Sequence, residues 1–226
     1  MGDERMYATA EDIEPALALS GRRCGSCSLC CRLLDVPEIG KPKDDWCRHC
    51  RAGHGGCSIY DQRPQVCRNY ACGWLLGHLA DDHWFPPKAK MVVDIHYDKK
   101  AVAHFVRVIV DPRFPNRWRE QPYYSDIRRI ALRGLQGKIV PETMVQTVIA
   151  ISGEWTKIVM PHREFDYGPG VVLPCGDDHF EFVPCKNDEA VRTLDKELTA
   201  LRQAKKDFPN ASILEALALV VQKTVR

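Results

Sequence analysis

The stretch Cys24-Gly-Ser-Cys27-Ser-Leu-Cys30-Cys31 begins the segment around which this chain of 226 residues is organised. Nine of the eleven cysteines lie in that segment, and their spacing includes three C-x2-C steps and one vicinal pair. Free cysteine is often a small buried hydrophobe, but this spacing is typical of bound metal. The nine candidate metal ligands are Cys24, Cys27, Cys30, Cys31, Cys47, Cys50, Cys57, Cys67 and Cys72.

Zinc is the first interpretation of this spacing. Cys24-x2-Cys27 is followed, after nineteen residues, by Cys47-x2-Cys50, and a start at Cys27-x2-Cys30 shortens the gap to sixteen. Both gaps fit the pattern of two zinc knuckles, in which four thiolates hold the ion tetrahedrally. Nine thiols exceed the needs of one such site, so the choice of pairs and the number of ions stay open.

An iron–sulfur cluster is the second interpretation. The run Cys24-x2-Cys27-x2-Cys30 reproduces the first three steps of the ferredoxin pattern C-x2-C-x2-C-x3-C-P. The fourth step fails because position 34 is leucine. Spacing alone does not separate zinc from a cluster. A fourth cluster ligand would come from Cys31 or from one of the later cysteines, Cys47, Cys57, Cys67 and Cys72.

A second motif follows the first: Cys57-Ser-Ile-Tyr-Asp-x-Arg-Pro-x2-Cys67-Arg68. Together the two motifs, over residues 21–75, resemble the CxxCxxCC family of zinc- or iron-chelating domains, also called YkgJ-type cysteine cluster proteins. The resemblance implies a bacterial metal-chelating protein. Cys50 and Cys72 depart from the common pattern, which leaves the number of metals open. The ligand roles that the resemblance implies fall on Cys24, Cys27, Cys30, Cys31, Cys47, Cys57 and Cys67.

The charges of the chain are nearly balanced. A net charge of +2 is too close to zero to predict nucleic-acid binding from the overall field. Between Gly21 and Cys72 basic residues outnumber acidic ones, which suits a segment whose ligand cysteines are thiolates. Arg68 directly follows Cys67, and we expect its positive charge to favour the neighbouring thiolates.

We expect a cytoplasmic protein that neither spans nor binds a membrane. Residues 1–20 carry acidic side chains and Pro15, unlike a secretory signal, and no stretch is long and apolar enough to span a bilayer. In a reducing compartment dense cysteines are more often metal ligands or catalytic thiols than disulfides. The strand-then-helix context of a catalytic C-x2-C pair is absent, which favours metal.

The chain divides into three regions that differ in composition and hydrophobic pattern. Residues 1–20 are a lead-in with at most one helical turn, 21–82 form a cysteine-cluster metal-binding module, and 88–226 form a larger domain whose role the sequence does not give. The module lacks hydrophobic periodicity, so its ligands or the larger domain must hold it. The predicted fold class is α+β: a small irregular cysteine-rich metal-binding module packed on an antiparallel-sheet domain with C-terminal helices.

Hydrophobic patterning predicts the elements of the larger domain. Alternating apolar and polar residues, or β-branched runs, predict strands at 91–97, 101–110, 144–151, 155–160, 171–173 and 180–183. Apolar stripes predict helices from Pro122 to Leu135, from Asn187 and from Ser212. A short helix is also predicted at 74–79, within the module. Cys175 and Cys185, far from the cluster, are not expected to be ligands.

Three functions fit these observations. The leading hypothesis is a metal-binding protein that coordinates zinc or an iron–sulfur cluster, with metal ions as its predicted partners. The second is a cluster-dependent oxidoreductase or group-transfer enzyme whose substrate pocket lies between the two domains. The third, less favoured, is a zinc-ribbon-like module that binds nucleic acid or an unidentified protein, because aromatic residues and arginines alternate between Trp46 and Trp74.

Overall fold

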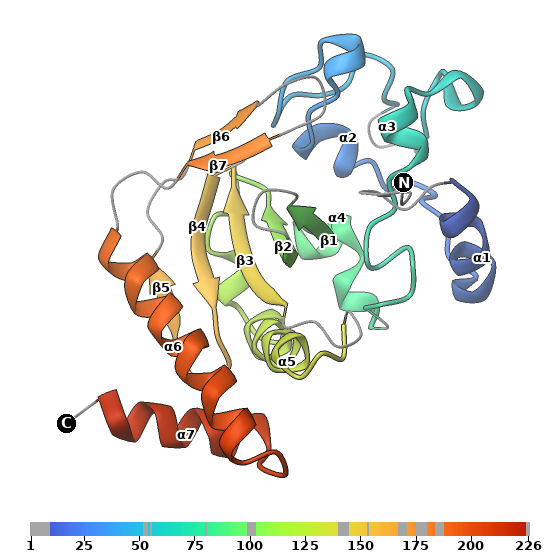
Figure 1. The fold of residues 1–226 in the computed structure, drawn as a ribbon. Helices are drawn as coiled ribbons and strands as arrows, with labels where there is room; N and C mark the ends of the chain where they lie inside the picture. The colour runs from blue at the N-terminus through green and yellow to red at the C-terminus, as the bar shows by residue number, and fades with distance from the viewer. Residues whose placement is uncertain are drawn as a thin grey trace, which may run out of the picture.

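A computed structural model describes residues 10–51, 54, 56–79, 81–98, 103–139, 145–152, 154–166, 171–174, 180–183 and 188–224. Five strands form one sheet in the order β1-β2-β3-β4-β5, and β6 pairs with β7 in a second sheet (Figure 1). The predicted mixture of helices and strands is confirmed. The strands are β1 (Met91–Asp98), β2 (Ala103–Val110), β3 (Gln146–Ile151), β4 (Glu154–Val159), β5 (Glu164–Asp166), β6 (Val171–Pro174) and β7 (Phe180–Val183).

The helices lie around the main sheet. In Figure 1, α1, α2 and α3 occupy the side of the molecule opposite α6 and α7. No helix in the described part of the chain is long and apolar enough to cross a membrane. The α-helices are α1 (Ala10–Ser20), α2 (Cys30–Leu33), α3 (Gln65–Arg68), α4 (Pro86–Ala89), α5 (Tyr123–Leu135), α6 (Asp188–Asp207) and α7 (Ile213–Thr224).

The sheet is mixed rather than antiparallel, so that part of the prediction is wrong. Strands β1 and β2 form the expected antiparallel hairpin, as do β3 and β4. Strands β2 and β3, however, pair in parallel, with Phe105 opposite Gln146 and Val110 opposite Ile151. The helix α5 lies between them in sequence and returns the chain to the same end of the sheet, which makes the next strand parallel.

Each face of the sheet packs against its own helices. Alternate residues of a strand point to opposite faces, so β2 places Val106 and Val108 on the face covered by α5, and Phe105 and Ile109 on the other face. That second face is covered by α6 and α7, whose predicted positions are confirmed. Leu33 of α2 and Leu29, the residue before α2, also pack against this second face. Apolar residues beside the cysteines therefore share a core with the sheet.

Two predictions near the N-terminal side are wrong. The lead-in contains a continuous helix, α1, that includes Pro15, where one turn was expected. Its Ile13 is buried, and this packing offsets the one backbone hydrogen bond that proline removes. Residues 74–79 form turns instead of a helix, because Gly73 N–H donates to the carbonyl of Val93 (2.6 Å) and ties this segment to the edge strand β1.

Candidate metal centre

The first four cysteines lie on one turn and one short helix. Cys27 N–H donates to the Cys24 carbonyl (2.7 Å), which closes the turn. Cys30 and Cys31 begin α2. Cys47, from a later loop, reaches the same place, because its N–H donates to the Cys31 carbonyl (3.1 Å).

The remaining cysteines approach from three other places. Cys50 and Cys57 face each other in an isolated antiparallel β-bridge. Cys67 lies on α3, where its thiol is within electrostatic range of those of Cys31, Cys47 and Cys57. Cys72 follows α3 and is likewise in range of Cys24 and Cys27. The fold thus gathers all nine predicted ligands in one region, although they are spread over the segment from 24 to 72.

Cys31 is the centre of this group of thiols. A hydrogen bond from the Cys30 thiol, followed by one from Cys50 and by the charges of Lys41 and Arg63, lowers the pKa of Cys31 to about 6, against the opposing effect of burial. The converse hydrogen bond to Cys31, together with burial, raises the pKa of Cys30. These contacts favour the thiolate form of Cys31 over that of its neighbours, and thiolates are both nucleophiles and metal ligands.

The surrounding thiols resist ionisation. Burial is the largest cause, and it raises the pKa of Cys27 to about 12 and of Cys50 and Cys67 to about 11. Repulsion from neighbouring sulfurs adds to this effect, since like charges disfavour the ionised form. A bound metal ion would reverse this effect, because it deprotonates the thiols that it binds.

The sulfurs are gathered but not arranged in a closed tetrahedral site. Among the described residues, which include all nine, no three cysteine sulfurs lie within 4.8 Å of one another. In a tetrahedral zinc site with Zn–S bonds of about 2.3 Å, neighbouring sulfurs are about 3.8 Å apart. The ligand set of each ion consequently stays a prediction, and binding requires side-chain movements that bring sulfurs closer.

Lys41 is a positive charge near the thiols that the sequence did not single out. Its side chain is buried, and Nζ donates to the carbonyls of Arg32 (2.6 Å) and Leu34. Burial lowers the pKa of Lys41, and the opposing charges include Cys31 and Cys47. The sequence could not identify this lysine, because residue 41 comes close to the cysteines of α2 only through tertiary folding.

The side chain of Arg68 contacts the backbone of the preceding loop. Its guanidinium donates to the backbone carbonyls of Arg63 (2.9 Å) and Asp61 (2.8 Å), so it braces the loop before α3. Arg63 provides a positive charge that acts on Cys24 and Cys31. Lys41 acts on Cys31 as well, while the effect predicted for Arg68 stays a prediction.

A second set of possible ligand atoms lies outside the cysteines. One ligand atom from each of Asp81, His83 and Asp126 lies within 4.8 Å of the other two. Asp126 already accepts hydrogen bonds from His83 (2.7 Å), Trp84 Nε1 (3.0 Å) and Arg129. Its carboxylate is therefore satisfied by the protein, and we read this group as a network that holds α5 against residues 81–84.

Cys175 and Cys185 lie outside the described residues, so their predicted lack of a role stays a prediction.

Comparisons with known proteins do not add to this picture. No match to this chain was found among models of protein families, curated proteins or solved structures. The function must accordingly be argued from the arrangement of the cysteines and from the surfaces around them.

Proposed function

We propose that this protein binds metal and coordinates zinc or an iron–sulfur cluster through its clustered cysteine thiolates. The observation that carries the proposal is the convergence of nine thiols on one region around Cys31, two of them in hydrogen-bonding range of its sulfur. Their chemistry suits a metal because neighbouring, partly exposed sulfurs repel one another when ionised, and a bound cation would offset that repulsion. The resemblance of the motifs to the bacterial CxxCxxCC family points to the same chemistry.

The two metal centres differ in what they allow. Zinc has no redox chemistry, so four thiolates around it would stabilise the segment from 24 to 72 and little else. An iron–sulfur cluster can carry electrons, which would favour the hypothesis of a cluster-dependent oxidoreductase or group-transfer enzyme. Both centres need reduced thiols, and we therefore propose the cytoplasm as the location.

The test is elemental analysis combined with a visible absorption spectrum. The protein is expressed without a metal-affinity tag and purified without oxygen. Iron with an equal amount of acid-labile sulfide and a brown colour would identify a cluster, whereas colourless protein with one or two zinc ions would identify zinc. Protein that contains neither metal after expression in medium supplied with both would contradict the proposal.

A pair of variants links the metal to the cysteines. We expect Cys24→Ser/Cys27→Ser to lose most of the bound metal, because two sulfurs of the predicted first half-site are removed. Cys185→Ser is the matched control, since it removes a cysteine far from the cluster in sequence, and it should keep the full metal content. Equal metal content in both variants would show that the predicted ligands are wrong.

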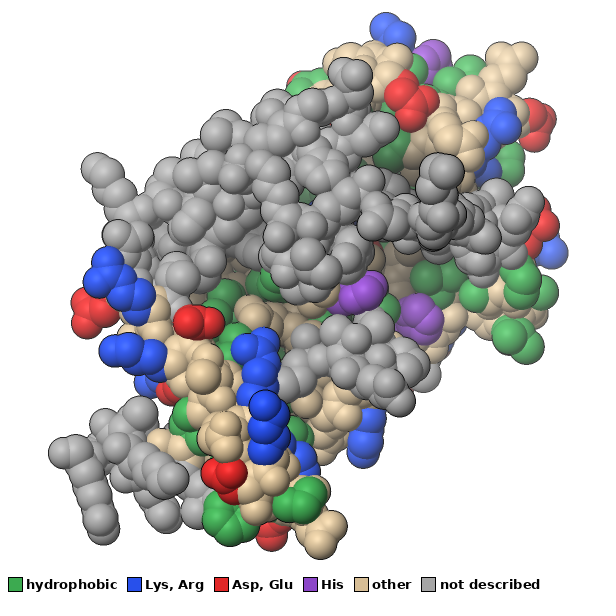
Figure 2. Space-filling model, in the orientation of Figure 1, with side chains coloured by type: hydrophobic (Ala, Val, Ile, Leu, Met, Phe, Trp, Pro, Cys, Tyr) green, Lys and Arg blue, Asp and Glu red, His purple; other side chains and the backbone are tan. Residues whose placement is uncertain are grey.

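The described part of one face gives no support to the nucleic-acid alternative. Figure 2 shows Lys and Arg side chains interspersed with Asp and Glu over the described part of one face. Binding to phosphates relies on clustered positive charge. The mixed charges on this face do not support such binding, and we do not propose it.

A further inference from the structure

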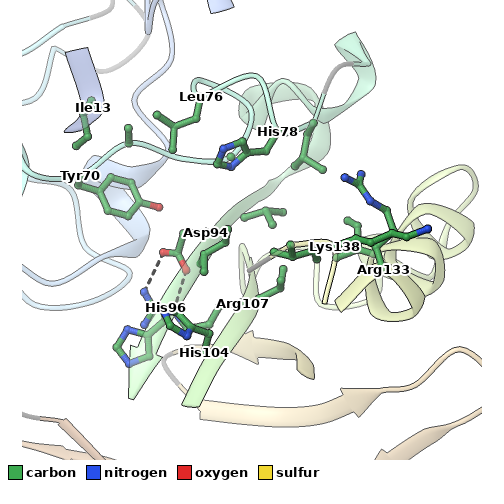
Figure 3. A pocket seen from close by; sticks show the side chains of 18 of the residues that line it. Ile13, Tyr70, Leu76, His78, Asp94, His96, His104, Arg107, Arg133 and Lys138 are labelled. Atoms are coloured by element: carbon green, nitrogen blue, oxygen red, sulfur yellow. Dashed lines mark hydrogen bonds and ion pairs between the residues drawn. The ribbon is translucent and has the colours of Figure 1, made fainter. Parts of the chain in front are cut away.

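A cavity of about 460 Å³ lies at the outer edge of the main sheet, beside β1 (Figure 3). Its wall comes from α1, from residues 69–79 after α3, from β1 and β2, and from the end of α5 with the turn that follows. This volume is in the range of about 300–1,000 Å³ that small-molecule sites occupy. The cavity therefore has room for a metabolite-sized ligand and is built from both the cysteine segment and the larger domain.

One end of the cavity is positively charged. Arg133, in the last turn of α5, and Lys138, just after it, both line the cavity and are exposed. Among the described residues, no carboxylate forms an ion pair with either side chain. Burial, followed by the charge of Arg133, lowers the pKa of the adjacent His78, so this histidine adds a neutral hydrogen-bonding group. Two exposed cations that have no carboxylate partner among the described residues favour an anion at this end.

The other end offers a hydrogen bond without net charge. Arg107 donates to both carboxylate oxygens of Asp94 (2.9 Å each), which neutralises that acid. The Tyr70 hydroxyl is buried and has no hydrogen-bond partner in the described structure, and Figure 3 shows it directed toward the middle of the cavity. Buried polar groups are nearly always satisfied, so a ligand atom that reached this hydroxyl would supply a hydrogen bond that the described residues do not.

Apolar side chains form part of the cavity wall. Leu79, Val93 and Ile130 are among them, and Figure 3 places Tyr70 on one side of the close-up and Arg133 with Lys138 on the other. A ligand that satisfies both ends must be elongated, with an apolar body in the middle.

We infer that this cavity binds a small organic anion with its acidic group against Arg133 and Lys138, its apolar body over Leu79 and Val93, and a polar atom at the Tyr70 hydroxyl. The acidic group is a carboxylate or a phosphate, because both pair with arginine through charged hydrogen bonds. The inference uses no metal, so it stands or falls separately from the proposed function.

The test uses a set of flat, rigid probes and isothermal titration calorimetry on the full chain as purified. The probe 6-hydroxy-2-naphthoate has an anionic and a hydroxyl end. We expect its neutral amide, 6-hydroxy-2-naphthamide, to bind about tenfold more weakly, the size of one lost charged hydrogen bond. Comparison of 2-naphthoate with 2-naphthyl phosphate then tells which acidic group the cavity prefers. Failure of every probe to bind at millimolar concentration would refute the inference.

Two variants assign the ends of the ligand. Arg133→Gln should weaken 6-hydroxy-2-naphthoate about tenfold and leave the amide unchanged, while Arg202→Gln, at an exposed position on α6, should change neither. The original protein should bind 6-hydroxy-2-naphthoate more tightly than 2-naphthoate, and Tyr70→Phe should abolish this difference. If Arg133→Gln binds both probes as the original protein does, the charged end is misassigned and the inference fails.

Metal content is measured on each of these samples. Anion binding in protein that holds no metal would sustain this inference while contradicting the proposed function. Normal metal content with equal binding of the acid and its amide would support the proposed function and contradict this inference.

Discussion

Arg32 links the cysteine segment to the sheet through one buried ion pair. It follows Cys31 on α2, and its Nη1 donates to both carboxylate oxygens of Asp111 (2.8 and 2.7 Å), whose side chain is fully buried. We expect Arg32→Met to lower the free energy of unfolding by about 3 kcal/mol, because it leaves a buried carboxylate with less compensation. Urea unfolding measures this change.

The control for this prediction is Arg51→Met, which removes an exposed arginine from the same cysteine-rich segment. It should change the free energy of unfolding by less than about 0.5 kcal/mol. A similar small change in Arg32→Met would mean that Arg113, the other partner of Asp111, compensates the carboxylate alone.

Asp111 also makes stability depend on pH. Burial raises its pKa, but hydrogen bonds from Arg113 and Arg32 outweigh this effect and hold the pKa below its ordinary value. A carboxyl group with a lowered folded pKa stabilises the protein above its unfolded pKa of about 3.9, and that stability is lost as the pH falls toward the folded pKa.

The corresponding variant is Asp111→Asn. Between about pH 4 and pH 2, the range below the unfolded pKa, we expect the free energy of unfolding to fall more steeply for the original protein than for the variant. Urea unfolding at a series of pH values compares them. Parallel pH profiles would show that the pKa of Asp111 is the same in the folded and the unfolded protein.

At the scale of elements, Gly134 sets how closely α5 approaches β3. Val145 N–H donates to the Gly134 carbonyl (3.0 Å), and a Cβ atom at position 134 would overlap the Val145 carbonyl oxygen. We expect Gly134→Ala to lower the free energy of unfolding by about 2 kcal/mol through overpacking, although alanine favours an isolated helix by about 1 kcal/mol. Arg202→Ala, at an exposed helical position, is the control; a more stable Gly134→Ala would contradict the close packing.

Periodicity predicted most elements because each signal is local. The alternation from 91 to 97 and the apolar stripe that begins at Pro122 correspond to β1 and α5. The parallel pairing of β2 with β3 was missed because strand direction depends on the path of the intervening helix. The turns at 74–79 were missed for a similar reason: their apolar residues suit a helix, but their contact with β1 decides their conformation.

The candidate site, like the elements, was predicted only where the signal is local. The cysteines could be identified as candidate ligands because their residue type and spacing can be read from the sequence. The charges around them could not be identified, because Lys41 reaches the thiols only through tertiary folding, while Arg68 points to backbone carbonyls instead. The cavity beside β1 was likewise hidden, as Tyr70 and Arg133 are far apart in sequence.

At the scale of the whole molecule, the sheet and the cysteine segment differ in how much apolar core they have. The central strands have a complete apolar core, with Val108, Val148 and Ile149 fully buried. The segment from 24 to 72 contributes only a few residues to that core, among them Leu29 and Leu33. On the proposed function, bound metal holds the rest of this segment.

Removal of the metal should therefore loosen one part of the chain. After chelation under reducing conditions, we expect amides in 24–72 to lose at least about tenfold of their hydrogen-exchange protection, while amides of β2 and β3 keep theirs, because local and global opening have separate free energies. The Cys24→Ser/Cys27→Ser variant should already show the loosened pattern and respond little to the chelator. Equal loss of protection in β2 and β3 would instead mean that the metal stabilises the whole fold, and that the shared core around Leu29 and Leu33 couples the cysteine segment fully to the sheet.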